Sequence, residues 1–164
     1  MSNIKPKKSK RFIFRDVIDI TPEFLAEQNI KFLMMDLDNT IAAYNEQVFA
    51  DNILSWIQEI KNSGVELFII SNSTRVDRVT SLSESIDIKF IMRAYKPSPK
   101  SLFDAMKQTN HDAKTSALVG DQIFTDGIAA KKAGITSILV RPRRFTNPFL
   151  AIRYFIELPI RAFR

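Results

Sequence analysis

The chain contains no cysteine, and this absence removes two kinds of chemistry at once. Disulfide bonds are excluded, and so is a phosphatase that uses a cysteine thiolate as its nucleophile. Histidine occurs once, as His111, in a polar stretch that we expect to be a loop. Phosphotransfer through histidine and hydrolysis by a Ser-His-Asp triad are therefore not expected.

Glycine is also scarce, with four residues in the 164, and none stands in a GxxxxGK[ST] or GxGxxG pattern. A nucleotide cradled by a glycine-rich loop therefore has no support. No uninterrupted apolar stretch approaches the roughly 20 residues of a membrane-spanning helix, so neither a transmembrane span nor a secretory signal is expected. We expect the cytoplasm of a bacterium, with an organelle as the alternative.

The composition, 45% hydrophobic, suits one domain with its own core. Apolar runs alternate with helix-like segments, which predicts an α/β fold: a doubly wound, Rossmann-like parallel sheet flanked by helices. Strands are predicted over residues 31–36, 65–70, 88–92, 116–120 and 135–140, and helices over residues 50–62, 75–85, 99–108 and 126–133. Trp56 falls on the apolar face of the first helix, so we expect it to be core packing.

Two aspartates, Asp36 and Asp38, follow an apolar run at the point where a buried strand should end. In extended chain their side chains leave on the same side, while Leu37 points the other way. Carboxylates this close favour a cation between them, and a hard, oxygen-seeking ion such as Mg²⁺ suits both. One carboxylate could then attack phosphorus while the other handles the proton. As turn formers or helix caps, the same aspartates would be purely structural.

Three further polar elements follow in order near the ends of predicted strands. They are Ser71-Asn72-Ser73, Lys96 within Tyr95-Lys96-Pro97, and Gly120-Asp121-Gln122-Ile123-Phe124-Thr125-Asp126. Taken singly, each has an ordinary explanation: a helix cap, a surface charge and a turn. Ligands of open α/β sheets bind beyond the carboxyl ends of the strands, so the elements together predict one site.

In this order, the elements resemble motifs I to IV of the haloacid dehalogenase (HAD) superfamily of aspartyl-phosphate phosphotransferases. The resemblance implies that Asp36 is the nucleophile and Asp38 the general acid and base. It also implies that the phosphoryl group is bound by Ser71, Asn72 and Lys96. Mg²⁺ would be held by the Asp36 carboxylate, the Asp38 backbone carbonyl and Asp121, with Asp126 binding metal through water or orienting Lys96.

The segments between these motifs are too short for a cap domain, since about ten residues separate Thr40 from the first predicted helix. Capless members of the superfamily accept bulky, macromolecular or membrane-borne phosphoesters. Over about residues 15–160 the chain resembles the class III phosphatases of the YqeG subfamily, which are related to phosphatidylglycerophosphate phosphatases. The resemblance implies that an anionic phospholipid, phosphatidylglycerophosphate, is hydrolysed to phosphatidylglycerol.

Positive charge is concentrated at the ends of the chain. Residues 1–11 and 141–164 hold eleven Lys or Arg and one acid, net +10, whereas residues 12–140 hold thirteen and seventeen, net −4. The C-terminal arginines, Arg153 and Arg161 among them, alternate with aromatic and aliphatic residues, as in an interfacial segment. We therefore expect peripheral contact with the inner face of an anionic membrane.

Together with the resemblance, this charge pattern divides the chain into a basic N-terminal tail over residues 1–14, a HAD-like phosphatase domain over residues 15–141, and a basic, aromatic segment over residues 142–164. The last segment is expected to pack on the domain or to face the membrane. Arg75 and Arg143 could reach a second phosphate of the substrate.

Other interpretations stay open. The C-terminal aromatic residues could complete the core, or the cations could attract RNA phosphates. The substrate could be a soluble sugar phosphate or a nucleic-acid end, or the chain could be a non-catalytic, RNA-associated protein of the same fold. No obligate protein partner is inferred.

Overall fold

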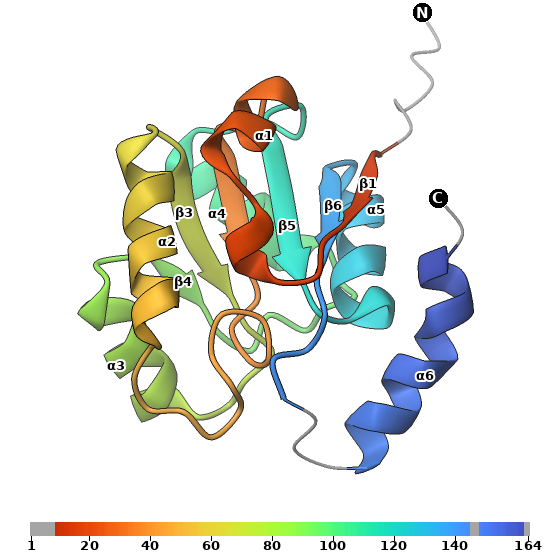
Figure 1. Ribbon diagram of the computed structural model, residues 1–164. Helices are drawn as coiled ribbons and strands as arrows, with labels where there is room; N and C mark the ends of the chain where they lie inside the picture. The colour runs from red at the N-terminus through yellow and green to blue at the C-terminus, as the bar shows by residue number, and fades with distance from the viewer. Residues whose placement is uncertain (1–8, 145–147, 163–164) are drawn as a thin grey trace, which may run out of the picture.

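The computed structural model describes residues 9–144 and 148–162, which fold around one six-stranded sheet (Figure 1). All pairings are parallel, in the order β1-β6-β5-β2-β3-β4. The strands are β1 (Arg11–Ile13), β2 (Phe32–Met35), β3 (Glu66–Ile70), β4 (Phe90–Ile91), β5 (Ser116–Gly120) and β6 (Thr136–Leu139). The helices are η1 (Val17–Asp19), α1 (Pro22–Glu27), α2 (Asp51–Asn62), α3 (Val76–Ser85), α4 (Lys100–Thr109), η2 (Ile123–Gly127), α5 (Ile128–Ala133) and α6 (Pro148–Ala162). The predicted fold class, a doubly wound parallel sheet flanked by helices, is confirmed.

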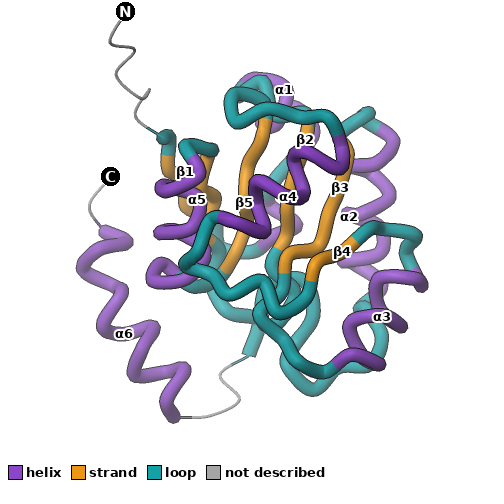
Figure 2. The backbone as a smooth tube through the Cα atoms, turned by 180° about the vertical axis from the view of Figure 1, so that it is seen from behind, coloured by secondary structure: helices purple, strands orange, loops and turns teal. Residues whose placement is uncertain are grey.

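Each face of the sheet packs against its own set of helices. In β2, Leu33 and Met35 belong to one core, which contains buried residues of α1, α2 and α3. Phe32 and Met34 point into the second core, which contains buried residues of α4 and α5. Figures 1 and 2 show the molecule from opposite sides. Because both faces are covered, every residue of β2 is buried, and the strand is apolar throughout.

The order of the strands places a crevice beside β2. The chain runs from β2 to β3 and β4 on one side, and then crosses to β5 and β6 on the other. Asp36, Ser71 and Asp121 directly follow the ends of three neighbouring parallel strands, β2, β3 and β5. They therefore lie at one edge of the sheet, next to the point where the strand order reverses.

All five predicted strands and all four predicted helices are present, with small shifts at their ends. β4 is reduced to Phe90–Ile91, and the helix predicted from residue 126 begins earlier, as a π-helix at Ile123. Trp56 is 3% exposed, and its indole Nε1 donates to the carbonyl of Ile20 at 2.8 Å. Core packing is therefore confirmed for Trp56. His111 lies in a loop after α4, as expected.

Assigning residues 11–13 to a tail was wrong, because β1 (Arg11–Ile13) pairs with Ser137–Leu139 at the edge of the sheet. Its Phe12 packs edge-to-face on Phe24 of α1, with ring centroids 5.0 Å apart. A strand of three residues has almost no local signal, and its pairing depends on distant chain. The basic residues Lys5, Lys7 and Lys8 lie outside the described residues.

The stretch between β2 and α2 contains only turns and one isolated bridge, Asp38 to Ala42, so within the described residues no cap domain is inserted there.

The C-terminal segment forms α6, at the periphery of the molecule (Figure 1). No helix in the described ranges is long and apolar enough to span a bilayer. Arg161, expected as an interfacial cation, is only 7% exposed, so that expectation was wrong. Phe145, Phe163 and Arg164 lie outside the described residues.

Candidate active site

A cavity of about 380 Å³ opens at the carboxyl edge of the sheet. It is lined by Asp36, Asp38, Asn39, Tyr44, Ser71, Asn72, Ser73, Thr74, Arg75, Lys96, Gln122, Thr125 and Asp126. Six of the seven residues that the sequence predicts for the site are in this lining. The seventh, Asp121, is 3% exposed and lies beside Thr40, whose hydroxyl is 3.5 Å from its Oδ1.

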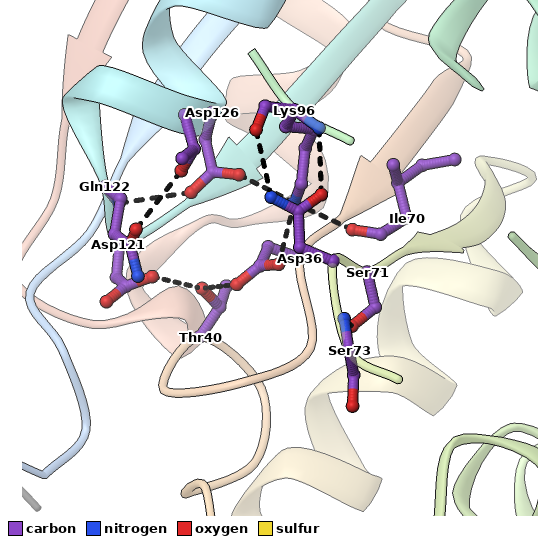
Figure 3. A network of polar contacts seen from close by, with 11 residues as sticks. Asp36, Thr40, Ile70, Ser71, Ser73, Lys96, Asp121, Gln122 and Asp126 are labelled. Carbon is purple, nitrogen blue, oxygen red and sulfur yellow. Dashed lines mark hydrogen bonds and ion pairs between the residues drawn. The ribbon is translucent and has the colours of Figure 1, made fainter. Parts of the chain in front are cut away.

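The ammonium group of Lys96 is the centre of the polar network in Figure 3. Its Nζ lies 2.7 Å from Asp36 Oδ1 and 2.7 Å from Asp126 Oδ1, and it donates to the carbonyl oxygen of Ile70 at 2.8 Å. A lysine has three N–H donors, and three acceptors surround this one. Lys96 is therefore held rigidly as a buried positive charge beside Asp36.

Both oxygens of the Asp36 carboxylate have partners. Lys96 holds Oδ1, while the Thr40 hydroxyl donates to Oδ2 at 3.1 Å. Thr40 comes from the tight turn after β2, in which the backbone N–H groups of residues 40–42 converge on the carbonyl of Leu37. This turn folds Thr40 back onto Asp36, a role that the sequence analysis did not assign.

Three buried carboxylates meet around one lysine. Asp36, Asp121 and Asp126 offer oxygen atoms that all lie within 4.8 Å of one another. Burial raises the pKa of Asp36 to about 7, although the neighbouring Lys96 opposes the shift. Burial, followed by the charges of Asp36 and Asp126, raises the pKa of Asp121 well above its ordinary value. Burial favours a lower pKa for Lys96, but the charges of Asp126 and Asp36 outweigh it and raise that pKa.

This donor set fits a divalent cation. Three buried carboxylates against one ammonium leave an excess of negative charge, which adds to burial in raising the pKa values of Asp36 and Asp121. The available ligand atoms are all oxygen, which hard cations such as Mg²⁺ prefer. Asp126 also accepts from the backbone N–H of Gln122 at 3.1 Å, which aligns its carboxylate with Lys96.

Asp38 is held by an arginine that the sequence analysis missed. Arg78 of α3 is 4% exposed, and its NH1 donates to Asp38 Oδ1 at 2.6 Å. The same guanidinium donates to the carbonyls of Glu46 and Ala43, both at 2.8 Å, so it ties the loop before α2 to α3. One signal was available: Arg78 lies four residues before the buried Leu82, on the apolar stripe of its helix.

Burial raises the pKa of Asp38, while the adjacent guanidinium of Arg78 acts to lower it. Its carboxylate is thus placed in the cavity with Asp36 but directed to a different cation. The side chain of Asp38 is not one of the carboxylates gathered around Lys96. Its backbone carbonyl as a metal ligand stays a prediction.

Ser71 and Asn72 line the wall supplied by β3. The Asn72 side chain bonds the backbone of Lys96 twice, donating to its carbonyl at 3.0 Å and accepting from its N–H at 2.8 Å. Ser71 Oγ accepts from the N–H of Ser73 at 3.1 Å. Asn72 therefore joins the β3 end of the cavity to the Lys96 loop.

The two arginines suggested for a second phosphate are placed differently. Arg75 lines the cavity, with its guanidinium 5.0 Å from the ring centroid of Tyr44 and its NH1 donating to the Tyr44 carbonyl at 2.5 Å. Arg143 is outside the lining and lies 3.6 Å from Asp16. Of the two, Arg75 alone is positioned at the cavity.

Comparison with known proteins points to the same enzyme family as the motifs in the sequence. A family model described as haloacid dehalogenase-like hydrolase matches residues 1–140. The chain is 32% identical over 136 residues to the Bacillus subtilis (strain 168) protein named Probable phosphatase YqeG, covering 83% of this chain and 78% of the relative.

Two solved structures illustrate the shared fold. One is 3-deoxy-D-manno-octulosonate 8-phosphate phosphatase from Moraxella catarrhalis, in complex with magnesium ion, phosphate ion and KDO, with a TM-score of 0.55 and 22% identity over 72% of this chain and 73% of that chain. The other is the cobalt-bound form of deoxy-D-mannose-octulosonate 8-phosphate phosphatase from Haemophilus influenzae, with a TM-score of 0.52 and 17% identity over 82% of this chain and 90% of that chain.

Proposed function

The chain belongs to the haloacid dehalogenase-like hydrolases and is a phosphatase of that family; we propose that it hydrolyses phosphomonoesters with Mg²⁺ through an aspartyl phosphate on Asp36. The observation that carries this proposal is the setting of Asp36. Its carboxylate stands in an open cavity between Lys96 and Thr40, and two further buried carboxylates lie within 4.8 Å.

In the first half of the reaction an oxygen of Asp36 attacks phosphorus, and the bond from phosphorus to the alcohol oxygen breaks. Asp38 gives its proton to that oxygen as the alcohol leaves. Burial raises the pKa of Asp38 and favours the protonated acid, while Arg78 limits the shift so that the conjugate base is also accessible. In the second half Asp38 takes a proton from water, which attacks the phosphoryl group and frees Asp36 and inorganic phosphate.

Lys96 supports these steps as a fixed charge. Its Nζ donates to Asp36 and to the Ile70 carbonyl and forms an ion pair with Asp126, so it favours ionised Asp36 and orients the carboxylate beside the phosphoryl group that it is proposed to bind. Ser71 and the backbone N–H of Asn72 are proposed to bind the phosphoryl oxygens from the opposite wall. Asp36, Asp121, the Asp38 carbonyl and, through water, Asp126 would hold Mg²⁺, which would offset the negative charge of phosphate and carboxylates.

For the substrate we propose phosphatidylglycerophosphate at the surface of an anionic membrane. The cavity has no inserted cap within the described residues, which leaves room for a large phosphoester. On α6 an apolar surface is exposed, made of Phe149, Ile152, Phe155 and Ile156 with exposed fractions of 57–83%. Apolar side chains on a peripheral helix together with terminal basic residues suit an interface with anionic lipid.

The deciding experiment assays purified protein with Mg²⁺ against phosphatidylglycerophosphate in vesicles and against a panel of soluble sugar phosphates and nucleic-acid ends. We expect turnover of the lipid to be highest. A preference for a soluble ester would move the proposal to that substrate class. If none of these phosphoesters is hydrolysed, the result would favour a non-catalytic role.

Asp36→Asn should abolish turnover of every substrate and leave the fold intact, because the amide is nearly isosteric and a poor nucleophile. Circular dichroism provides the control for folding. Turnover near the wild-type rate in well-folded Asp36→Asn protein would show that Asp36 is not the nucleophile.

A further inference from the structure

α6 buries charged side chains and exposes apolar ones, the reverse of an ordinary amphipathic helix. Among its side chains that the structure describes, only Glu157 and Arg161 are buried, at 1% and 7% exposure, and both are charged. They are one turn apart and pair with each other, with Arg161 NH2 3.2 Å from Glu157 Oε2. Among the described side chains, the fully buried contacts of the helix with the domain are therefore polar.

Arg161 binds the ends of two neighbouring strands. Its NH1 donates to the carbonyl of Val140 at 3.0 Å, just beyond β6, and its NH2 donates to the backbone carbonyl of Asp121, just beyond β5. The planar guanidinium can reach both carbonyls at once because its donors form a rigid fork. The position of the Asp121 peptide is therefore set by a residue forty positions away in the chain.

Glu157 binds the segment that follows Asp121, at the start of η2. Its Oε1 accepts from the backbone N–H groups of Ile123, at 3.1 Å, and Phe124, at 3.4 Å. These are the first residues of η2, whose own N-cap residue, Gln122, makes no side-chain capping bond. Glu157 thus caps the helix from a distant element and satisfies donors that would otherwise be buried without partners.

We infer that Glu157 and Arg161 are positioning residues for residues 121–124, the metal-binding loop. In this inference, α6 packed on the domain orients the Asp121 carboxylate toward the cation. The inference rests on the proposed function, in which Asp121 is a metal ligand. Arg161 holds the carbonyl of Asp121 itself and Glu157 holds the N–H group two residues later, so the backbone that directly follows the Asp121 side chain has little freedom. Groups that orient metal ligands raise affinity because the ligands are placed before the ion arrives.

The test measures Mg²⁺ binding by titration calorimetry on the full-length protein, without substrate. Arg161→Gln should weaken Mg²⁺ binding about 10- to 100-fold. Arg161→Lys keeps the charge but loses the fork, so it should also weaken binding. Glu157→Gln keeps the shape and should have a smaller effect in the same direction. Arg141→Gln is the matched control, because it removes an exposed guanidinium next to Val140 and should bind as wild type.

A kinetic measurement separates positioning from general damage. The Mg²⁺ concentration for half-maximal activity should rise in Arg161→Gln, while kcat at saturating Mg²⁺ returns close to the wild-type value. Should Arg161→Gln fail to fold, Arg161→Lys and Glu157→Gln decide the question. If the wild-type protein is active and the folded variants bind Mg²⁺ as tightly as it does, the positioning role is overturned and the proposed function stands. A wild-type protein that neither binds Mg²⁺ nor hydrolyses phosphoesters would overturn the proposed function as well.

Discussion

At the scale of single residues, Asp36 has to satisfy two opposing demands. It must be ionised to attack phosphorus, yet it is buried with two other carboxylates, and burial raises its pKa to about 7. Lys96 compensates for part of the charge, and a divalent cation would compensate for more. Proton binding and metal binding therefore compete in this site.

This competition predicts how stability depends on pH. The pKa of Asp36 is about 7 in the folded protein and 3.8 for the ordinary group, so the metal-free folded state holds a proton that the unfolded state has released. The stabilisation that this proton gives the folded state is fully present below about pH 4. It is lost as pH rises to about 7, which lowers the free energy of unfolding by an amount on the order of a few kcal/mol. Urea unfolding between these limits, with EDTA, measures it.

Two controls isolate the carboxylate. Asp36→Asn should reduce the decline, because the amide does not titrate, and leave the part that comes from the raised pKa of Asp121. Mg²⁺ should reverse the decline near pH 7 by binding the ionised site. A wild-type curve that matches Asp36→Asn across the same pH range would contradict the assignment of the raised pKa to Asp36.

Gly120 provides a second prediction at this scale. A Cβ at this position would overlap the carboxyl group of Asp126, which Lys96 and the N–H of Gln122 hold in place. Gly120→Ala should therefore displace Asp126 and lower kcat/KM about 100-fold. Gly127→Ala is the matched control, since a Cβ there meets only ordinary contacts at 3.6 Å or more, and its activity should be unchanged. Equal activity of both variants would count against a positioning role for Asp126.

At the scale of elements, the two sides of α6 differ in burial and in chemistry. The buried charged pair binds the loop after β5, whereas the aromatic and aliphatic side chains are exposed. An exposed apolar surface of this kind has a cost in water that is relieved when a lipid interface covers it. The helix could then bind the membrane without releasing the metal loop.

Replacing Phe149, Phe155 and Ile156 with Ser should weaken binding to phosphatidylglycerol vesicles at least about tenfold, because each side chain contributes on the order of 1 kcal/mol or more when buried. Hydrolysis of a small soluble ester should stay at the wild-type rate. Vesicle flotation measures the first quantity and a colorimetric assay the second. Phe103→Ser, which removes a half-exposed aromatic from α4, should change neither. Undiminished flotation of the triple variant would exclude α6 as the membrane contact.

At the scale of the whole molecule, charge is distributed unevenly, with net +10 in residues 1–11 and 141–164 against −4 in the remainder. The burial of Arg161 removes one of these cations from the surface, so the proposed attraction to a membrane has to come from the others. Surface charges act over about 8 Å at physiological ionic strength, which makes such attraction sensitive to salt.

Binding of the wild-type protein to phosphatidylglycerol vesicles should therefore fall steeply when salt is raised from about 50 mM to about 500 mM. Vesicles of neutral phosphatidylcholine are the control and should bind weakly at both concentrations. Protein that stays in the soluble fraction with anionic vesicles at low salt would refute the membrane proposal and favour a soluble or nucleic-acid substrate.

The sequence by itself determined the fold class and which motif residues meet at the carboxyl edge of the sheet. Apolar runs that end in Asp36, Ser71 and Asp121 are local signals, and parallel strands bring such ends to one edge whatever the details of packing. The tertiary structure alone decided that Arg78 holds Asp38 and that Arg161 and Glu157 hold the loop of Asp121. These contacts join residues more than thirty positions apart, and hydrophobic periodicity does not specify the partner of a charged side chain.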